Sequence, residues 1–133
     1  MFLLDSNAWI TVFRKKSQSL VDEVKRREAN EIVLCSIVIS ELWFGVCRSA
    51  PDQRAKNAQL INELCAKHVS LPFDDVAARD CAELRSHLAA IGLPIGPFDL
   101  QIAAIARTNG ATLITHNVAE FSRVPGLLIQ DWQ

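Results

Sequence analysis

The sequence contains no hydrophobic run long enough to cross a membrane. In this chain of 133 residues, the longest apolar stretches fall far short of the ~20 residues that a transmembrane helix needs. The first residues also lack the pattern of a secretory signal peptide. We therefore expect a soluble, cytoplasmic protein with no membrane partner.

The chain also lacks a charge excess and any segment of biased composition. Its 14 basic and 15 acidic residues leave a formal net charge of −1. No overall basic field therefore points to nucleic acid, although acids gathered at one site could conceal local basic patches. Because half of the residues are hydrophobic and no linker or repeat interrupts them, we expect residues 1–133 to form a single domain.

No Cys-x-x-Cys pair occurs among the four cysteines, which argues against a zinc site. Each cysteine lies in an apolar or helical pattern, so we expect reduced core residues at Cys35, Cys47, Cys65 and Cys81. Three other familiar signatures are absent: a Ser-His-Asp grouping, a Walker loop and a G-x-G-x-x-G fingerprint. The chemistry of the chain must therefore rest on other residues.

Short apolar runs alternate with longer amphipathic ones along the chain. This alternation favours an α/β domain whose mostly parallel sheet has no wet face. The predicted strands are Phe2–Leu4, Ile32–Cys35, Val69–Leu71, Thr112–Ile114 and Leu127–Ile129. The predicted helices are Ser17–Glu28, one with Pro51 in its first turn that runs to Ala66, one capped by Asp74 that runs through Ala90, and one containing Pro97–Ala106 and followed by Gly110.

Three acidic residues stand inside apolar segments that are far apart in the sequence. Asp5 ends the run that begins at Met1, Glu41 interrupts residues 37–44, and Asp99 lies in the nearly apolar segment 97–106. An acid in a core is unfavourable unless something compensates its charge, so the three acids suggest one shared cation site. Asp5 and Asn117 both follow predicted strands, at the edge where α/β sheets form their sites.

The chemistry of such a site follows from its oxygen ligands. With no histidine pair or thiolate nearby, the carboxylates suit Mg²⁺, with Mn²⁺ as the alternative. Clustered carboxylates repel one another, and a divalent ion resolves that conflict. The ion can also lower the pKa of a bound water and hold a phosphate oxygen for in-line attack.

Four ordered motifs resemble those of PIN-domain ribonucleases, and in particular the VapC-type toxins of bacterial toxin–antitoxin modules. The motifs are Leu4-Asp-Ser-Asn7, Ser40-Glu-Leu-Trp-Phe-Gly45, Pro94-Ile-Gly-Pro-Phe-Asp-Leu-Gln-Ile-Ala-Ala104 and Leu113-Ile-Thr-His-Asn-Val-Ala-Glu-Phe121. The resemblance implies a three-layer α/β/α sandwich that acts as a Mg²⁺- or Mn²⁺-dependent endoribonuclease. Asp5, Glu41 and Asp99 would then hold the metal, and translation-related RNA such as tRNA would be the substrate.

The sequence departs from the family pattern at the fourth acidic position. Many PIN domains have Asp where this chain has Asn117, with Glu120 three residues later. Asn117 is counted among the catalytic residues, although it is neutral and a weaker ligand, and Glu120 could supply the missing charge. The hydroxyls of Ser6 and Thr115 could orient a water or a phosphate.

The same resemblance implies an inhibitory VapB-type antitoxin and a homodimer. The apolar surface of the early helices is the expected docking groove. We expect His116 to face solvent or to have a structural role, because neighbours at a strand end point in opposite directions.

Two alternatives remain open at this point. A receiver-like signalling domain also places acids at strand ends around Mg²⁺, but the chain lacks its pair of acids after the first strand and its later lysine. A catalytically inactive PIN module that binds RNA or protein is favoured only by Asn117. A magnesium-dependent cleavage assay separates that module from the nuclease.

Overall fold

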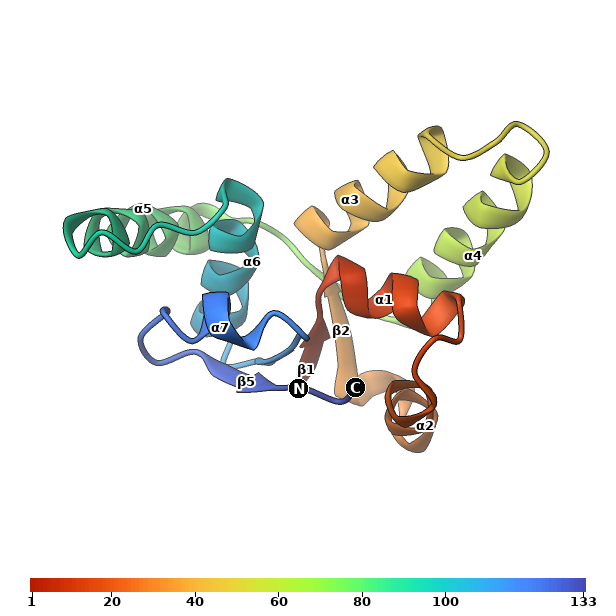
Figure 1. Cartoon of the computed structure of the whole chain (residues 1–133), viewed down its shortest axis with the longest axis horizontal. Helices are drawn as coiled ribbons and strands as arrows, with labels where there is room; N and C mark the ends of the chain where they lie inside the picture. The colour runs from red at the N-terminus through yellow and green to blue at the C-terminus, as the bar shows by residue number, and fades with distance from the viewer.

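The computed structural model describes residues 1–133 and contains a parallel sheet covered on both faces by helices (Figure 1). The five strands lie in the order β3-β2-β1-β4-β5, and every neighbouring pair is parallel. In chain order the elements are β1 (Phe2–Leu4), α1 (Ser6–Phe13), α2 (Gln18–Arg26), the 3₁₀ helix η1 (Ala29–Glu31), β2 (Ile32–Cys35), α3 (Ser36–Cys47), α4 (Arg54–Lys67), β3 (Ser70–Leu71), α5 (Asp75–Ala90), α6 (Pro97–Thr108), β4 (Thr112–Ile114), α7 (Val118–Phe121) and β5 (Leu128–Gln130).

The order of the strands reverses at the centre of the sheet. The chain moves outward from β1 through β2 to β3, then crosses back to β4 and β5 on the other side of β1. Right-handed crossovers therefore place the helices before β3 and those after it on opposite faces. Figure 1 shows this division, with α1–α4 on one side of the strands and α5–α7 on the other. The predicted three-layer α/β/α sandwich is confirmed.

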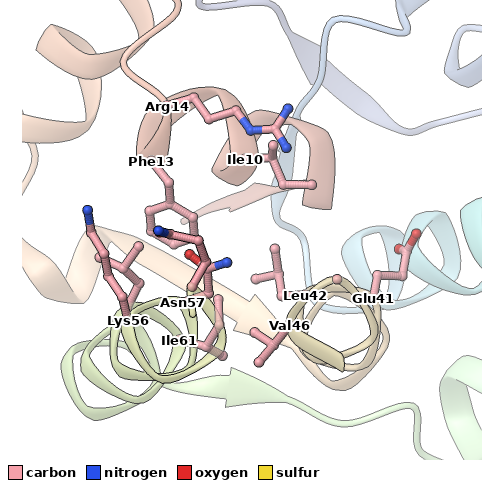
Figure 2. Close-up of a pocket in the computed structure, with 12 residues that line it drawn as sticks. Ile10, Phe13, Arg14, Glu41, Leu42, Val46, Lys56, Asn57 and Ile61 are labelled. Atoms are coloured by element: carbon pink, nitrogen blue, oxygen red, sulfur yellow. The ribbon is translucent and has the colours of Figure 1, made fainter. Parts of the chain in front are cut away.

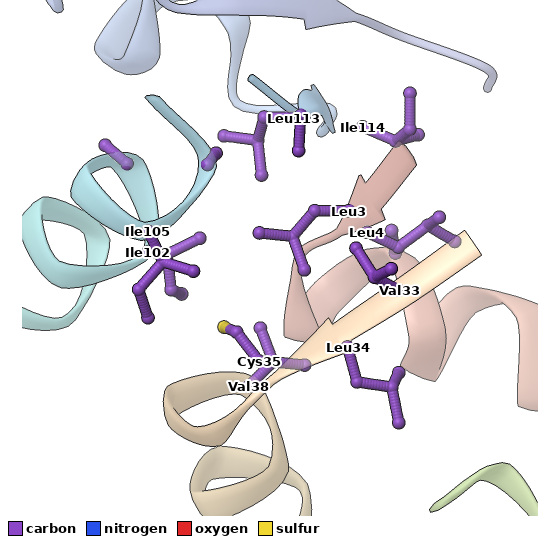
Figure 3. Close-up of a cluster of buried hydrophobic side chains, with 14 of the residues drawn as sticks. Leu3, Leu4, Val33, Leu34, Cys35, Val38, Ile102, Ile105, Leu113 and Ile114 are labelled. Carbon is purple, nitrogen blue, oxygen red and sulfur yellow. The ribbon is translucent and has the colours of Figure 1, made fainter. Parts of the chain in front are cut away.

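The core lies on both faces of the sheet, because successive strand residues point in opposite directions. All four residues of β2 are buried, as expected of a central strand with no wet face. In Figure 3, Leu3 of β1 points toward Ile102 and Ile105 of α6, and all three belong to one cluster of 29 buried residues.

The two ends of the chain are held together. Figure 1 places the N- and C-termini side by side. The Arg27 guanidinium lies over the rings of Phe2 and Trp132, at 4.5 and 5.0 Å from their centroids. The Ser19 hydroxyl donates a hydrogen bond of 2.7 Å to the Trp132 carbonyl. These contacts fix the C-terminal residues against the sheet.

The structure corrects several details of the predicted elements. Pro51 lies in a turn before α4, which begins only at Arg54, and the short helix α7 was not predicted. The four cysteines are free, but Cys47 and Cys65 are exposed and only Cys35 is buried. No helix combines the length and apolarity that crossing a membrane requires.

Candidate active site

Asp5 lies directly beyond β1 and caps the helix that follows. Its Oδ1 accepts a hydrogen bond of 2.8 Å from the Ala8 amide, as a helix N-cap requires. Its own backbone amide donates to the Ile114 carbonyl of β4 at 3.1 Å. The residue is 6% exposed, and burial raises its pKa although the Thr115 hydroxyl and the Ala8 amide oppose that rise.

Glu41 lies near the same region, on the connection between β2 and β3. It belongs to α3, which begins directly after β2. Its Oε1 is buried and has no hydrogen-bond partner. Burial raises the pKa of the carboxyl, the Ser6 hydroxyl lowers it, and the charge of Asp5 raises it further.

Asp99 stands in the first turn of α6, two residues after Pro97. The fixed backbone angle of proline suits the start of a helix, and an acid in the first turn is favoured by the helix dipole. Burial nevertheless raises the pKa of Asp99 to about 6, with further contributions from the charges of Glu120, Glu41 and Asp5. Asp99 thus responds to acids from three other segments of the chain.

Glu120 binds the side chain of Asn117, the residue at the fourth acidic position of the family pattern. Its Oε2 accepts a hydrogen bond of 2.8 Å from the Asn117 side chain, and its Oε1 accepts one of 3.2 Å from the Gly96 amide. These two donors lower the pKa of the Glu120 carboxyl. Both oxygens are therefore engaged in tying the loop before α7 to the start of α6.

The two hydroxyls predicted to orient water or phosphate lie beside the acids of the site. Ser6 and Thr115 are both buried. The Thr115 hydroxyl accepts a hydrogen bond of 3.0 Å from the Asn117 amide and lowers the pKa of Asp5. The Ser6 hydroxyl acts on Glu41 in the same way.

The chemistry of the site suits a divalent cation. Three carboxyls with raised pKa values interact with one another, and a buried Glu41 oxygen lacks a partner. Hard oxygen donors are the ligands that Mg²⁺ and Mn²⁺ prefer. Nowhere in the structure, however, are three or more His, Cys, Asp or Glu side chains placed to hold one ion together. Mg²⁺ usually keeps several waters and takes only one or two carboxylates directly.

The structure gives His116 a location that the sequence did not reveal. Its side chain is exposed, as expected, but it lines an open polar pocket together with Asp5 and Asn117. Its partner is Asp131, fifteen residues later in the chain. Nothing in the sequence pattern indicates that pairing, because it depends on how β5 joins the sheet beside β4.

An apolar groove adjoins the acidic site. It is lined by residues of α1, α3 and α4, including Ile10, Phe13, Val46 and Ile61. Figure 2 shows Glu41 at one end of the groove and Lys56 at the other. Whatever occupies this groove therefore comes within reach of a carboxylate of the site.

The sequence profile of the PIN domain family matches residues 2–127. The chain is 33% identical over 131 residues to the tRNA(fMet)-specific endonuclease VapC of Shigella flexneri, covering 98% of this chain and 97% of the relative. It is 31% identical over 133 residues to ribonuclease VapC2 of Rickettsia felis, covering 99% and 98% of the two chains.

Solved structures of toxin–antitoxin complexes share the fold. A chain of VapBC2 from Rickettsia felis, bound to a promoter DNA fragment, superposes with a TM-score of 0.89 at 30% identity and covers 99% of this chain and 98% of that one. A chain of DNA-bound VapBC from Salmonella typhimurium gives a TM-score of 0.90 at 30% identity, with the same coverage.

Proposed function

Because this chain belongs to the PIN domain family, we propose that it is the toxin of a toxin–antitoxin module and an endoribonuclease that hydrolyses RNA phosphodiester bonds. Its relatives include a tRNA(fMet)-specific endonuclease and a ribonuclease. The observation that carries the proposal is the gathering of three carboxyls at one edge of the sheet: Asp5 is buried at the cap of α1, Glu41 has a buried oxygen without a partner, and Asp99 stands in the first turn of α6. We also propose that residues 1–133 act as one PIN-like domain, since a single cluster of 29 buried residues forms its core. The location that we propose for it is the cytoplasm.

Membership of the PIN family implies a divalent metal in general, and we propose Mg²⁺, with Mn²⁺ as an alternative. Asp5, Glu41 and Asp99 would hold the ion. When bound, it would supply positive charge to the phosphate and lower the pKa of a water molecule. The chain itself supplies the positions of the carboxylates: the cap of α1, the second turn of α3 and the first turn of α6.

The polar residues beside the acids have supporting roles in this proposal. Asn117, held by Glu120, contributes a neutral amide at the fourth position. We propose that the hydroxyls of Ser6 and Thr115, which lower the pKa values of Glu41 and Asp5, orient a water or a phosphate at the site. We propose tRNA as the substrate class, because the relatives from Shigella flexneri and Salmonella typhimurium are named as tRNA(fMet)-specific.

The partner that we propose is a VapB-type antitoxin, seated in the apolar groove between α1, α3 and α4. The groove offers side chains such as Ile10, Phe13 and Leu60 to an amphipathic segment, with Arg14 and Lys56 for acidic residues on it. Because Glu41 lies at one end, the bound segment would also obstruct the acidic site. The homodimer implied by the resemblance stays a prediction, which light scattering of the free toxin would test.

Neutralising one carboxylate tests the mechanism. We expect Asp5→Asn or Asp99→Asn to lower the rate of tRNA(fMet) cleavage in Mg²⁺ by at least ~100-fold, because loss of a direct ligand should cost no less than loss of a surrounding hydrogen bond. Circular dichroism and a thermal melt would show whether the fold is intact. Asp52→Asn, in the exposed turn before α4, is the matched control and should leave cleavage unchanged.

Two results would contradict the mechanism. One is undiminished cleavage by either variant, and the other is full cleavage by the wild-type protein in the presence of EDTA. A wild-type protein that binds tRNA but cleaves none in Mg²⁺ or Mn²⁺ would favour the inactive PIN module instead.

A further inference from the structure

His116 and Asp131 form a pair beside the acidic site, close enough for both to act on Asp5. The distance from His116 Nδ1 to Asp131 Oδ2 is 2.9 Å, and the two side chains are 69% and 30% exposed. The other Asp131 oxygen accepts a hydrogen bond of 3.0 Å from the Gln133 amide. The carboxylate is therefore held at both oxygens while the imidazole faces the surface.

The position of Asp131 is set by its neighbour in the chain. Trp132 is buried and anchored by Arg27, Phe2 and Ser19. The residue that orients His116 thus rests on the contacts that join the two ends of the chain. Such an arrangement preorganises an exposed imidazole, which would otherwise sample several rotamers.

The pair borders a pocket with no hydrophobic lining. The pocket has a volume of about 330 Å³ and is lined by Asp5, Asn7, Thr11, His116, Asn117 and Gln133. It lies between the ends of β1 and β4, where the strand order reverses and where α/β sheets bind their ligands. Its size is at the lower end of the range for ligand pockets, ~300–1,000 Å³, which suits a single nucleotide unit.

The pocket shares Asp5 with the acidic site. A nucleic-acid strand whose reacting phosphate lies at the carboxylates would therefore place an adjacent sugar at the pocket. Apart from Asp5, its side chains are neutral amides, a hydroxyl and an imidazole. These groups match the hydroxyls of a ribose, whereas no lysine or arginine is present to bind a phosphate.

The hydrogen bond to Asp131 decides what the imidazole can offer. A carboxylate only accepts hydrogen bonds, so Nδ1 of His116 must be the donor in the pair. In the neutral ring, Nε2 is then left as an acceptor. A ribose 2′-hydroxyl can donate to such an atom, and it is the group that distinguishes RNA from DNA.

We infer that Nε2 of His116 accepts a hydrogen bond from a ribose 2′-hydroxyl next to the cleaved bond, and that Asp131 is the positioning residue that keeps Nε2 an acceptor. The inference rests on the proposed nuclease function and adds to it the group by which the site selects RNA. It predicts that the pair contributes to RNA binding but not to DNA binding.

Binding measured on a cleavage-deficient background tests this inference. The probes are a fluorescent transcript of tRNA(fMet) and a DNA of the same sequence, bound by the Asp99→Asn protein in Mg²⁺ at pH 8 and followed by anisotropy. Adding His116→Ala should weaken RNA binding by about 3- to 10-fold, as expected for one hydrogen bond. DNA binding should not change, so the preference for RNA should fall by the same factor.

Two conservative changes separate the acceptor from the shape of the ring. Gln carries a carbonyl oxygen near the position of Nε2, so His116→Gln should restore part of the RNA preference. Asn reaches only the position of Nδ1, so His116→Asn should not restore it. His87→Ala, on the exposed surface of α5, is the histidine control and should leave both affinities unchanged.

Asp131→Asn tests the tautomer. The side-chain amide that this substitution introduces can donate to Nδ1 of His116, which moves the ring proton to Nε2 and removes the acceptor. The RNA preference should therefore fall as far as in His116→Ala, and it should fall no further when both changes are combined. Thermal melts of all variants would check that they are folded.

The outcomes separate this inference from the function on which it rests. Equal losses of RNA and DNA binding in His116→Ala, or no loss at all, would overturn the role of His116 while leaving the nuclease proposal standing. Failure of the wild-type protein to cleave tRNA(fMet) or total tRNA in Mg²⁺ or Mn²⁺ would overturn the nuclease proposal, and this inference with it.

Discussion

At the scale of single residues, the acidic site is a place where the fold holds unfavourable charge. Asp5 is buried, Glu41 has an unpartnered oxygen, and Asp99 has its pKa raised to about 6. Functional sites commonly carry such perturbed groups, because the arrangement suits a ligand rather than the free protein. The metal-free protein should therefore gain stability when one of these charges is removed.

The pH dependence of stability should reveal this at Asp99. Well below pH 3.8 its carboxyl is protonated in both the folded and the unfolded chain. As the pH rises, the unfolded chain ionises from the ordinary pKa of 3.8, whereas the folded one ionises only near 6, so the contribution of Asp99 to stability falls between these values. At pH 7.5 Asp99→Asn should thus raise the free energy of unfolding of the metal-free protein by on the order of 1 kcal/mol, a figure reduced for solvent screening at this half-buried group.

Urea unfolding at pH 3.5 and 7.5, in the presence of EDTA, measures this difference. Asp52→Asn is the exposed control and should show no such pH dependence. A stabilisation by Asp99→Asn that is equally large at both pH values would rule out the ionisation of Asp99 as its source.

At this scale the sequence indicates the three acids but not the contacts of their neighbours. Asp5, Glu41 and Asp99 stood out because acids are rare in apolar segments, and the structure brings their charges within reach of one another. The engagement of both Glu120 oxygens and the pairing of His116 with Asp131 were not foreseen. Both depend on residues that are brought together only by folding.

At the scale of elements, α3 contributes both to the core and to the functional surface. One of its faces packs Val38 and Leu42 into the core, and Glu41 projects toward the acidic site. Its exposed Gly45 lines the apolar groove, and a Cβ at this position would meet nothing within 4 Å. The groove can therefore be altered there without disturbing the core.

Filling the groove at Gly45 should weaken antitoxin binding without loss of the fold. We expect Gly45→Gln to lower the affinity for the cognate antitoxin by about 10-fold or more, because the long side chain would fill the part of the groove in which the antitoxin segment binds. Stability should rise by about 0.5–1 kcal/mol, since glycine is unfavourable inside a helix. Isothermal titration with the antitoxin and urea unfolding give the two values.

Gly45→Ala is the matched control for that experiment. It gains at least as much helix propensity but adds only a methyl group, so its antitoxin affinity should stay close to that of the wild-type protein. If Gly45→Gln bound the antitoxin as tightly as Gly45→Ala does, the groove would not be the docking site.

The secondary structure itself was largely predictable. The strands Phe2–Leu4, Ile32–Cys35 and Thr112–Ile114 have the expected bounds, because short apolar runs between helical patterns are typical of buried parallel strands. Asp74 caps α5 as expected, accepting a hydrogen bond of 2.9 Å from Ala77. The predicted start of α4 was wrong: the helix begins at Arg54, because Pro51 suits a turn as well as the first turn of a helix.

At the scale of the whole molecule, the topology brings the site together. Asp5 follows β1, Thr115 follows β4, and these neighbouring strands are joined by the hydrogen bond between the Asp5 amide and the Ile114 carbonyl. Glu41 and Asp99 arrive on crossovers to either side. A ligand that binds all three acids would therefore link both halves of the sheet.

Mg²⁺ should stabilise the entire fold for this reason. A ligand that binds only the folded chain adds about 2.7 kcal/mol when its concentration is 100 times its Kd. We expect the thermal midpoint of the wild-type protein to rise with Mg²⁺ at pH 7.5, and the rise to be lost in Asp5→Asn. Differential scanning fluorimetry measures it, with NaCl of equal ionic strength as the control.

A midpoint that rises equally in the wild-type protein and in Asp5→Asn would place the ion elsewhere. A midpoint that does not respond to Mg²⁺ at any concentration would contradict the proposed ligand set.

The sequence by itself determined the α/β class, most of the element bounds and the three acids, because hydrophobic periodicity and buried charge are local properties of a chain. Only the tertiary structure decided the strand order, the groove beside Glu41, the engagement of Glu120 and the pairing of His116 with Asp131. These features join residues from distant segments, and no local pattern records which strands become neighbours. The reversal of strand order between β1 and β4 is what turns separate motifs into one site.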